Sequence, residues 1–296
     1  MKNKKDQASF HIMIMPAMIF LLIFSFVPMF GIIMAFQNYM PVKGILGSPW
    51  VGLDNFKFMF QIPDSKQIFI NTLVIAISKI IAGTFVTIIF SLLLNEIRIK
   101  FAKKIIQTVV YLPNFLSWVI LATVILNIFS YDGPINAFIS SMGIKPILFT
   151  ASNKWFRPML VITDVWKNFG YGSIIYLATL TSIDPALYEA AYMDGANRFK
   201  QMLHVTLPGL MPTIMLITVM NLPNVLNAGF DQIFNLYNPL VYQTADIIDT
   251  YVYRVGLIQR QYSLGTAVGL LRSIVGIILI LSANKIAKKV TDYQIF

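Results

Sequence analysis

The sequence has no cysteine and only two histidines, His11 and His204. The missing thiols exclude disulfides, thiolate metal sites and cysteine nucleophiles, and two histidines leave little for a histidine-based metal or acid–base site. Charge is scarce as well: 12% of the residues are charged, against roughly 25% in soluble chains. With 57% hydrophobic residues and a mean hydropathy of +0.70, the chain is expected to be an all-α integral membrane protein.

The sequence contains several long apolar stretches. A membrane-spanning helix needs about 20 mainly apolar residues. Six stretches meet that length, which predicts six transmembrane helices: about 11–36, 68–94, 105–130, 158–181, 211–231 and 264–283. The first run follows Lys2, Lys4 and Lys5 as a signal peptide would, but it is too long and lacks a small-residue cleavage site. It is therefore expected to be a span, within a single transmembrane domain over 11–296 that follows a tail at 1–10.

The net charge of +10 lies mostly at the ends of the apolar runs. That placement favours membrane topology over a nucleic-acid partner. With the N-terminus inside, the predicted inner segments hold 12 Lys and Arg residues and the longer outer segments hold 8. The positive-inside rule then predicts that both termini and the 182–210 loop are cytoplasmic.

Polar residues within the predicted spans carry the functional hypothesis, because a charge near the bilayer centre costs roughly 2.5–3.5 kcal/mol. In the fourth span Asp164 and Lys167 are three residues apart and are expected to pair. Asp164, Asn168 and Tyr171 follow i, i+4, i+7 and form one stripe, with Trp166 off it. In the fifth span Asn221, Asn224, Ala228 and Asp231 recur at three and four residues, and Asn227 lies beside them. Pro223 and Gly229 interrupt that helix.

Two interpretations of these stripes stay open. One is hydrogen bonding between helices, worth about 0.6–2 kcal/mol per contact. The other is a water-lined pathway, which the two stripes together favour because lipid faces neither of them. Amides and carboxylates suit the hydroxyl groups of a neutral solute, and aromatic faces suit sugar rings. The candidate pathway residues are Asp164, Trp166, Lys167, Asn168, Tyr171, Tyr176, Asn221, Asn224, Asn227 and Asp231.

Three further features of the spans are left open by the sequence. Lys79 and Arg272 each stand alone near mid-span, facing a partner subunit, the pathway or an acidic residue elsewhere. Leu112-Pro113-Asn114 predicts a kink near the cytoplasmic end of the third span, with a structural or a gating role.

The loop at 182–212 contains two predicted short helices. Asp184 is a good N-cap, Pro185 suits the first helical position, and Gly195 can end the first helix in the left-handed conformation. A second short helix follows, which Pro208 and Pro212 are expected to close. Taken alone, this pattern indicates either a solvated loop or a docking element.

Glu189-Ala190-Ala191, Asp194-Gly195-Ala196 and Leu207-Pro208 together resemble the EAA loop of ATP-binding-cassette importer permeases. Val205 stands where that pattern usually has Ile. The resemblance implies contact with a partner ATPase through eight residues: Glu189, Ala190, Ala191, Asp194, Gly195, Arg198, Leu207 and Pro208.

Further stretches resemble sugar-type permeases, namely residues 51–56 and, for importers of oligosaccharides and polysaccharide fragments, residues 229–242 and 245–254. The family implies a type I importer permease fold, a second similar permease, a pair of cytoplasmic ATPases and an external sugar-binding protein or lipoprotein. It also implies location in a bacterial cell membrane. The expected function is sugar import by alternating access. Alternatives are another polar solute such as glycerol phosphate, an ion-coupled secondary transporter, or a membrane enzyme.

The chain shows no G-x-x-x-x-G-K-[ST] nucleotide-binding motif, so ATP and Mg are expected on partner subunits and no cofactor or metal on this chain. Few histidines and no clustered catalytic carboxylates disfavour the enzyme. The absence of a visible inverted repeat disfavours the secondary transporter.

Overall fold

A computed structural model describes residues 4–291, and within this range the chain is helical with no strand. A single isolated β-bridge joins Gln37 and Trp50. The all-α class predicted from the sequence is confirmed. The longer helices are α1 (Lys4–Leu21), α4 (Asp54–Gln61), α5 (Ser65–Glu96), α6 (Lys100–Tyr111), α7 (Trp118–Ile128), α8 (Pro134–Ser141), α9 (Phe156–Ser182), α10 (Pro185–Met193), α12 (Leu207–Asn221), α13 (Phe230–Leu236) and α16 (Tyr262–Thr291).

Shorter segments join these helices. The short α-helices are α2 (Val27–Met29), α3 (Gly44–Gly47), α11 (Arg198–Gln201), α14 (Tyr242–Ala245) and α15 (Ile248–Tyr251). The 3-10 segments are Phe30–Phe36, Leu112–Phe115, Phe149–Ala151, Leu222–Leu226 and Pro239–Val241, and the π-helical segments are Leu22–Phe26, Met202–Thr206 and Val252–Ile258.

Length and hydropathy mark four helical runs of the described chain as able to cross a membrane: Phe10–Phe36, Ser65–Glu96, Arg198–Asn221 and Tyr262–Ser282. A fifth is added if the pair Lys100–Phe115 and Trp118–Ile128 counts as one broken span. α9 has the extent predicted for the fourth span, but its polar stripe lowers its hydropathy, and it is not among these runs.

Two predicted helix ends are wrong. Pro208 and Pro212 do not close the second loop helix, since the helical run continues from Arg198 to Asn221. A proline ring clashes with the carbonyl four residues earlier. For Pro208 that carbonyl belongs to His204, inside the wider π-helical turn Met202–Thr206, which has room for the ring. The predicted fifth span, 211–231, is accordingly displaced toward the N-terminus.

The described chain forms two compact units. The first comprises the described residues up to Ser65 together with Tyr251–Ser273. Its connecting segment is ordered by polar bonds: Asn55 Nδ2 donates to the carbonyls of Ala35 and Gln37, and the Tyr39 amide donates to Ser263 Oγ at 2.8 Å. Asn55, from the string at 51–56, thus has a structural place here.

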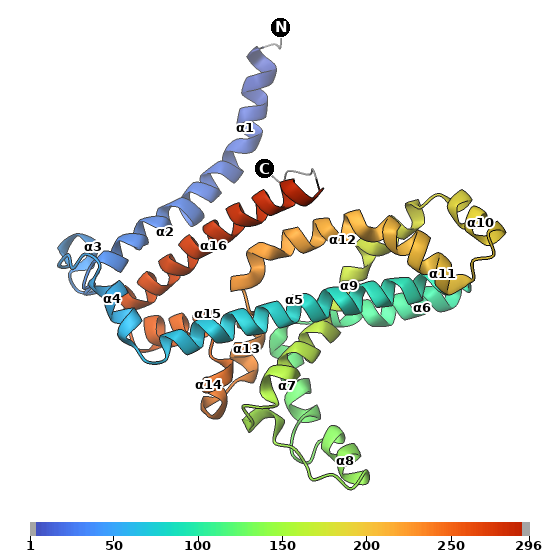
Figure 1. The fold of residues 1–296 in the computed structure, drawn as a ribbon. Coiled ribbons are helices and arrows are strands. Elements are labelled where there is room, and N and C mark those ends of the chain that lie inside the picture. The colour runs from blue at the N-terminus through green and yellow to red at the C-terminus, as the bar shows by residue number, and fades with distance from the viewer. Residues whose placement is uncertain (1–3, 292–296) are drawn as a thin grey trace. The chain divides into compact units, whose positions relative to one another are not determined.

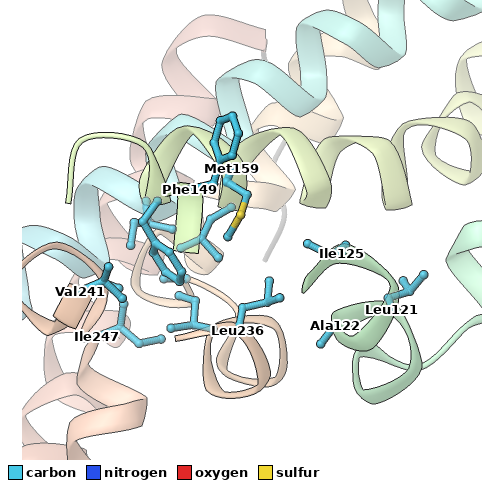
Figure 2. Close-up of a cluster of buried hydrophobic side chains, with 14 of the residues drawn as sticks. Leu121, Ala122, Ile125, Phe149, Met159, Leu236, Val241 and Ile247 are labelled. Carbon is cyan, nitrogen blue, oxygen red and sulfur yellow. The ribbon is translucent and has the colours of Figure 1, made fainter. Parts of the chain in front are cut away.

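The second unit, Lys66–Thr250 with the described residues from Ile274, contains the main apolar core. Phe156 and Leu160 of α9 are fully buried in it. Figure 2 shows side chains of α7, α9, α13 and the following loop meeting in this cluster. A second cluster joins Leu94, Tyr176, Leu177, Leu180 and Leu210. In Figure 1, α10 and α11 lie at the end of α5 and α6.

α6 and α9 pack closely at Gly170. A methyl group there would collide with the backbone carbonyl of Val110, which cannot move aside as a flexible side chain would. We predict that Gly170→Ala lowers the free energy of unfolding by about 1–3 kcal/mol, because the added methyl group overpacks this contact. The check is the thermal midpoint of the purified protein in detergent. Gly276→Ala is the matched control, since nothing lies within 4 Å of a methyl group at that helical position. An equal midpoint for the two variants would contradict the close packing of α6 on α9.

Candidate functional site

A cavity of about 570 Å³, lined by both apolar and polar residues, lies within the second unit. Its walls come from α5, the turn after α6, α9, the end of α12 and the break that follows. Seven of the ten predicted pathway residues line it: Asp164, Asn168, Tyr171, Tyr176, Asn221, Asn224 and Asn227. Trp166, Lys167 and Asp231 do not.

The α9 stripe reaches the cavity because its members share one face. Asp164, Asn168 and Tyr171 lie at i, i+4 and i+7, and all three line the cavity. Trp166, predicted to lie off the stripe, is 44% exposed and outside it. Tyr176 is buried, and its hydroxyl has no hydrogen-bond partner among the described residues. Features of both interpretations are present: Asp164 and Asn168 contact Lys79 and Asn114 of other segments, and both also border the cavity.

The predicted interruption of the fifth span is confirmed. α12 ends at Asn221, a 3-10 turn covers Leu222–Leu226, and Gly229 has a φ of 91° before α13 begins. That left-handed conformation favours glycine. At membrane depth such backbone is tolerated only where protein or water covers it. Here protein buries Ala228 fully, and Asn224 and Asn227 border the cavity rather than lipid.

The expected pairing of Asp164 with Lys167 is wrong. Asp164 Oδ1 lies 3.4 Å from Nζ of Lys79, on α5. Lys79 also donates to the Ala228 carbonyl at 2.7 Å and to Gln232 Oε1. A lysine from another helix reaches the carboxylate from across the cavity wall, a partner that spacing within α9 does not predict. This contact also settles where Lys79 points.

Lys167 instead fastens the bend between α6 and α7. Its Nζ donates to the carbonyls of Pro113, Asn114 and Leu116 at 3.1, 2.8 and 2.6 Å. The third span does bend near the predicted kink: the 3-10 turn Leu112–Phe115 follows α6, and a 105° bend then separates Lys100–Phe115 from Trp118–Ile128. The ammonium gives these carbonyls a charged donor, and the Pro113 carbonyl also accepts from the Leu116 amide.

Several cavity residues were missed by the sequence reasoning. Gly83, Thr84 and Thr87 line the wall on α5, and Asn114 donates to Asn168 Oδ1 at 3.1 Å. Gly83 and Thr87 follow Lys79 at i+4 and i+8, so a search for small residues on the face of that lysine would have found these two.

The loop at 182–212 has the predicted caps. Asp184 accepts a hydrogen bond from the Ala186 amide at 2.9 Å, and α10 starts at Pro185. Gly195 has a φ of 77°, and the Ala196 amide returns to the Ala191 carbonyl. Asn197, not anticipated, caps α11 through the Lys200 amide.

The surface of this loop is exposed and partly apolar. Tyr192 is 72% exposed and Met193 83%. A second cavity of about 570 Å³ is lined by residues of α10 and α11, among them Glu189. Arg198 lies 3.6 Å from Glu96 at the end of α5, an exposed pair of little energetic weight that nevertheless places α11 beside α5.

The remaining predicted loop residues surround this region. Ala190 and Asp194 are exposed, Ala191 is half-buried, and Leu207 and Pro208 begin α12. Two short helices with an apolar exposed face, joined directly to a cavity-lining helix, can transmit a push from a bound partner to the cavity.

Comparison with known proteins identifies this arrangement. A family model described as the binding-protein-dependent transport system inner membrane component matches residues 88–292. The chain belongs to this permease family. The predicted resemblance to importer permeases is confirmed, and the protein is a multi-pass transport permease subunit of an ATP-binding-cassette importer.

Relatives cover nearly the whole permease. Protein LplB of Bacillus subtilis (strain 168) is 42% identical over 97% of this chain and 90% of its own length. The polygalacturonan/rhamnogalacturonan transport system permease protein YteP of the same organism is 42% identical over 98% of this chain and 91% of its own. A crystal structure of a bacterial ABC transporter for import of the acidic polysaccharide alginate matches at 37% identity with a TM-score of 0.89, covering 97% of each chain. The type I permease fold is thereby confirmed.

The Lys167 contacts generate a prediction for this permease. Lys167→Met removes the ammonium that donates to three carbonyls, so the backbone of 111–117 should open more readily. We expect at least about tenfold faster hydrogen exchange in peptides covering that segment, measured by mass spectrometry on the purified protein.

Lys145→Met serves as the control, because Lys145 is an exposed lysine in the connection between α8 and α9. Exchange at 111–117 that is equal in both variants would show that Lys167 does not hold the bend.

Proposed function

We propose that this permease imports an oligosaccharide across a bacterial cytoplasmic membrane by alternating access. The observation that carries the proposal is the composition of the cavity wall. Asn114, Asn168, Asn221, Asn224 and Asn227 supply amides there, and two tyrosines supply ring faces. Amides both donate and accept hydrogen bonds, as a polyhydroxylated solute requires. Relatives named for pectin-type fragments and alginate support a glycan substrate.

The proposed topology has six spans with both termini in the cytoplasm. It counts α9 and the bent pair α6–α7 as spans, in addition to the four apolar runs. α9 qualifies on two grounds: it is 27 residues long, enough to cross the hydrocarbon core, and its polar stripe faces the cavity rather than lipid. Lys and Arg placement then puts α10 and α11 on the cytoplasmic side.

The partners follow from that side assignment. We place a pair of cytoplasmic ATPases, holding ATP and Mg, against α10 and α11, with Glu189 as the polar contact and the exposed Tyr192 and Met193 as apolar contacts. A second, similar permease completes the pathway. An external sugar-binding protein delivers the solute, a proposal supported by the matching alginate transporter, which was also solved with an alginate pentasaccharide-bound periplasmic protein.

The cavity argues against the alternatives. A glycerol phosphate-like solute calls for cations facing it, but among the described lining residues the only cation, Lys79, is engaged by Asp164. An ion-coupled carrier would use Asp164 and Asp231 as ion sites. Asp231 lies outside the cavity, and Asp164 already has a lysine partner.

The substrate class is tested on the sugar-binding protein encoded beside this permease. A thermal-shift screen with neutral oligosaccharides, uronate oligosaccharides and glycerol phosphate is expected to give stabilisation by an oligosaccharide. Stabilisation by glycerol phosphate alone would contradict the proposal.

The loop is tested at its elbow. Gly195 has a left-handed φ, and its amide donates to the Tyr192 carbonyl at 3.0 Å. Proline has neither the amide proton nor access to that φ. Gly195→Pro should therefore reduce ATP-driven uptake at least about tenfold in membranes containing the whole transporter, while insertion of the chain is preserved.

Gly195→Asn is the matched variant, because asparagine tolerates the left-handed region. It should retain most of the uptake. If Gly195→Pro transports like the parent with its ATPases still bound, the docking role of this loop is wrong.

A further inference from the structure

Lys79 is a buried ammonium with a full set of acceptors. Its side chain is 8% exposed, and its three protons face Asp164, the Ala228 carbonyl and Gln232. Gln232 is itself fully buried and donates to the Leu160 carbonyl and to Thr163 Oγ1, both at 2.8 Å. The network therefore ties α5, α9 and α13 together beside the core of the second unit.

The carboxylate of Asp164, by contrast, remains accessible from the cavity. The Asp164 side chain is 22% exposed and lines the cavity. Within residues 4–291, Lys79 is the one group found in contact with its carboxylate oxygens, so lone pairs remain for a ligand. Asp164 is also the only carboxylate among the described residues that line the cavity.

The charge balance of the wall follows from these two residues. Lys79 and Asp164 are the only charged residues among the described lining residues, and they face each other at 3.4 Å. The remaining polar groups are amides and hydroxyls. The wall therefore has no net charge, although it holds a strong hydrogen-bond acceptor.

We propose that Asp164 is a hydroxyl-accepting subsite for the transported glycan and that Lys79 is its positioning residue, fixing the carboxylate in the wall and cancelling its charge. This inference rests on the proposed function for the identity of the solute. A carboxylate binds neighbouring hydroxyls of a sugar ring through charge-assisted hydrogen bonds. The solute surface at this point presents hydroxyl groups, and a carboxylate of an acidic glycan lies elsewhere along the pathway.

The charge balance can be measured without any solute or ATP. Because the chain has no cysteine, Thr84→Cys places a unique thiol on it in the cavity wall. The purified transporter in detergent is treated with a cationic and an anionic methanethiosulfonate of similar size, and labelling of this chain is followed by mass spectrometry. With the native pair, the ratio of the two rates should match that of free cysteine within about twofold. A ratio that differs tenfold from that of free cysteine would contradict the claim that Lys79 and Asp164 compensate each other's charge.

Substitutions of the pair should then move this ratio in opposite directions. Asp164→Asn leaves an unmatched ammonium and should favour the anionic reagent by about fivefold or more, and Lys79→Met should favour the cationic one. The double variant should return to the parent ratio. A purely structural role predicts no such opposite shifts. If the single variants fail to assemble, the ratio of labelling rates at Thr84→Cys in the otherwise native chain still tests whether the two charges compensate each other.

The subsite is tested with the glycan found for the binding protein. Asp164→Asn should raise the KM for stimulation of ATP hydrolysis by the glycan-loaded binding protein about tenfold or more, with a smaller change in kcat. Asp132→Asn, at an exposed position in an outer connection, is the control and should change neither. An unchanged KM for Asp164→Asn would contradict the proposal that Asp164 binds the glycan. The labelling result stands apart from this outcome, so failure of the proposed substrate and failure of the pair are distinguishable.

Discussion

The ammonium of Lys79 is the constraint on which the cavity depends. An unpaired charge in an apolar span is costly, so the chain must bring oxygen atoms to it from other helices. α9 supplies Asp164, the break after α12 supplies the Ala228 carbonyl, and α13 supplies Gln232. Removing one partner of a buried pair typically costs about 3–5 kcal/mol because a charge is left unpaired, so separation of these elements is disfavoured. The cavity lies along this junction.

The irregular backbone beside the cavity also needs hydrogen-bond partners from other helices. Two helices of the second unit bend or break at the cavity, one after α6 and one after α12. Each exposes carbonyl groups that lipid cannot satisfy, and each is met by a lysine: Lys167 at the first break and Lys79 at the second. Lys79 and Lys167 thus stabilise irregular backbone beside the cavity, and the described cavity wall has no net charge.

The sequence predicted what depends on local chemistry. The caps at Asp184 and Gly195, the interruption at Gly229 and the shared face of Asp164, Asn168 and Tyr171 all follow from one segment at a time, and the structure confirms them. The partners of Lys79 and Lys167 come from residues more than 50 positions away, so spacing could not reveal them. The sequence did not predict that the helix continues through Pro208, because this depends on the π-helical turn Met202–Thr206, which no residue pattern indicates.

Residue-level coupling roles and the six-span topology rest on the loop, the cavity and the charge distribution together. The loop continues directly into α12, whose last residue, Asn221, lines the cavity. A partner that moves α10 and α11 thereby moves the cavity wall. This mechanical continuity is the physical basis for assigning the energy source to a docked ATPase rather than to an ion moving through the chain.

The most direct measurement of that claim is uptake of the labelled oligosaccharide into proteoliposomes. The chain is reconstituted alone, and then with its partner permease, ATPases and loaded binding protein, each with ATP or with an imposed ion gradient. The account predicts uptake only by the complete assembly and only with ATP. Uptake by the chain alone, driven by the ion gradient, would contradict it.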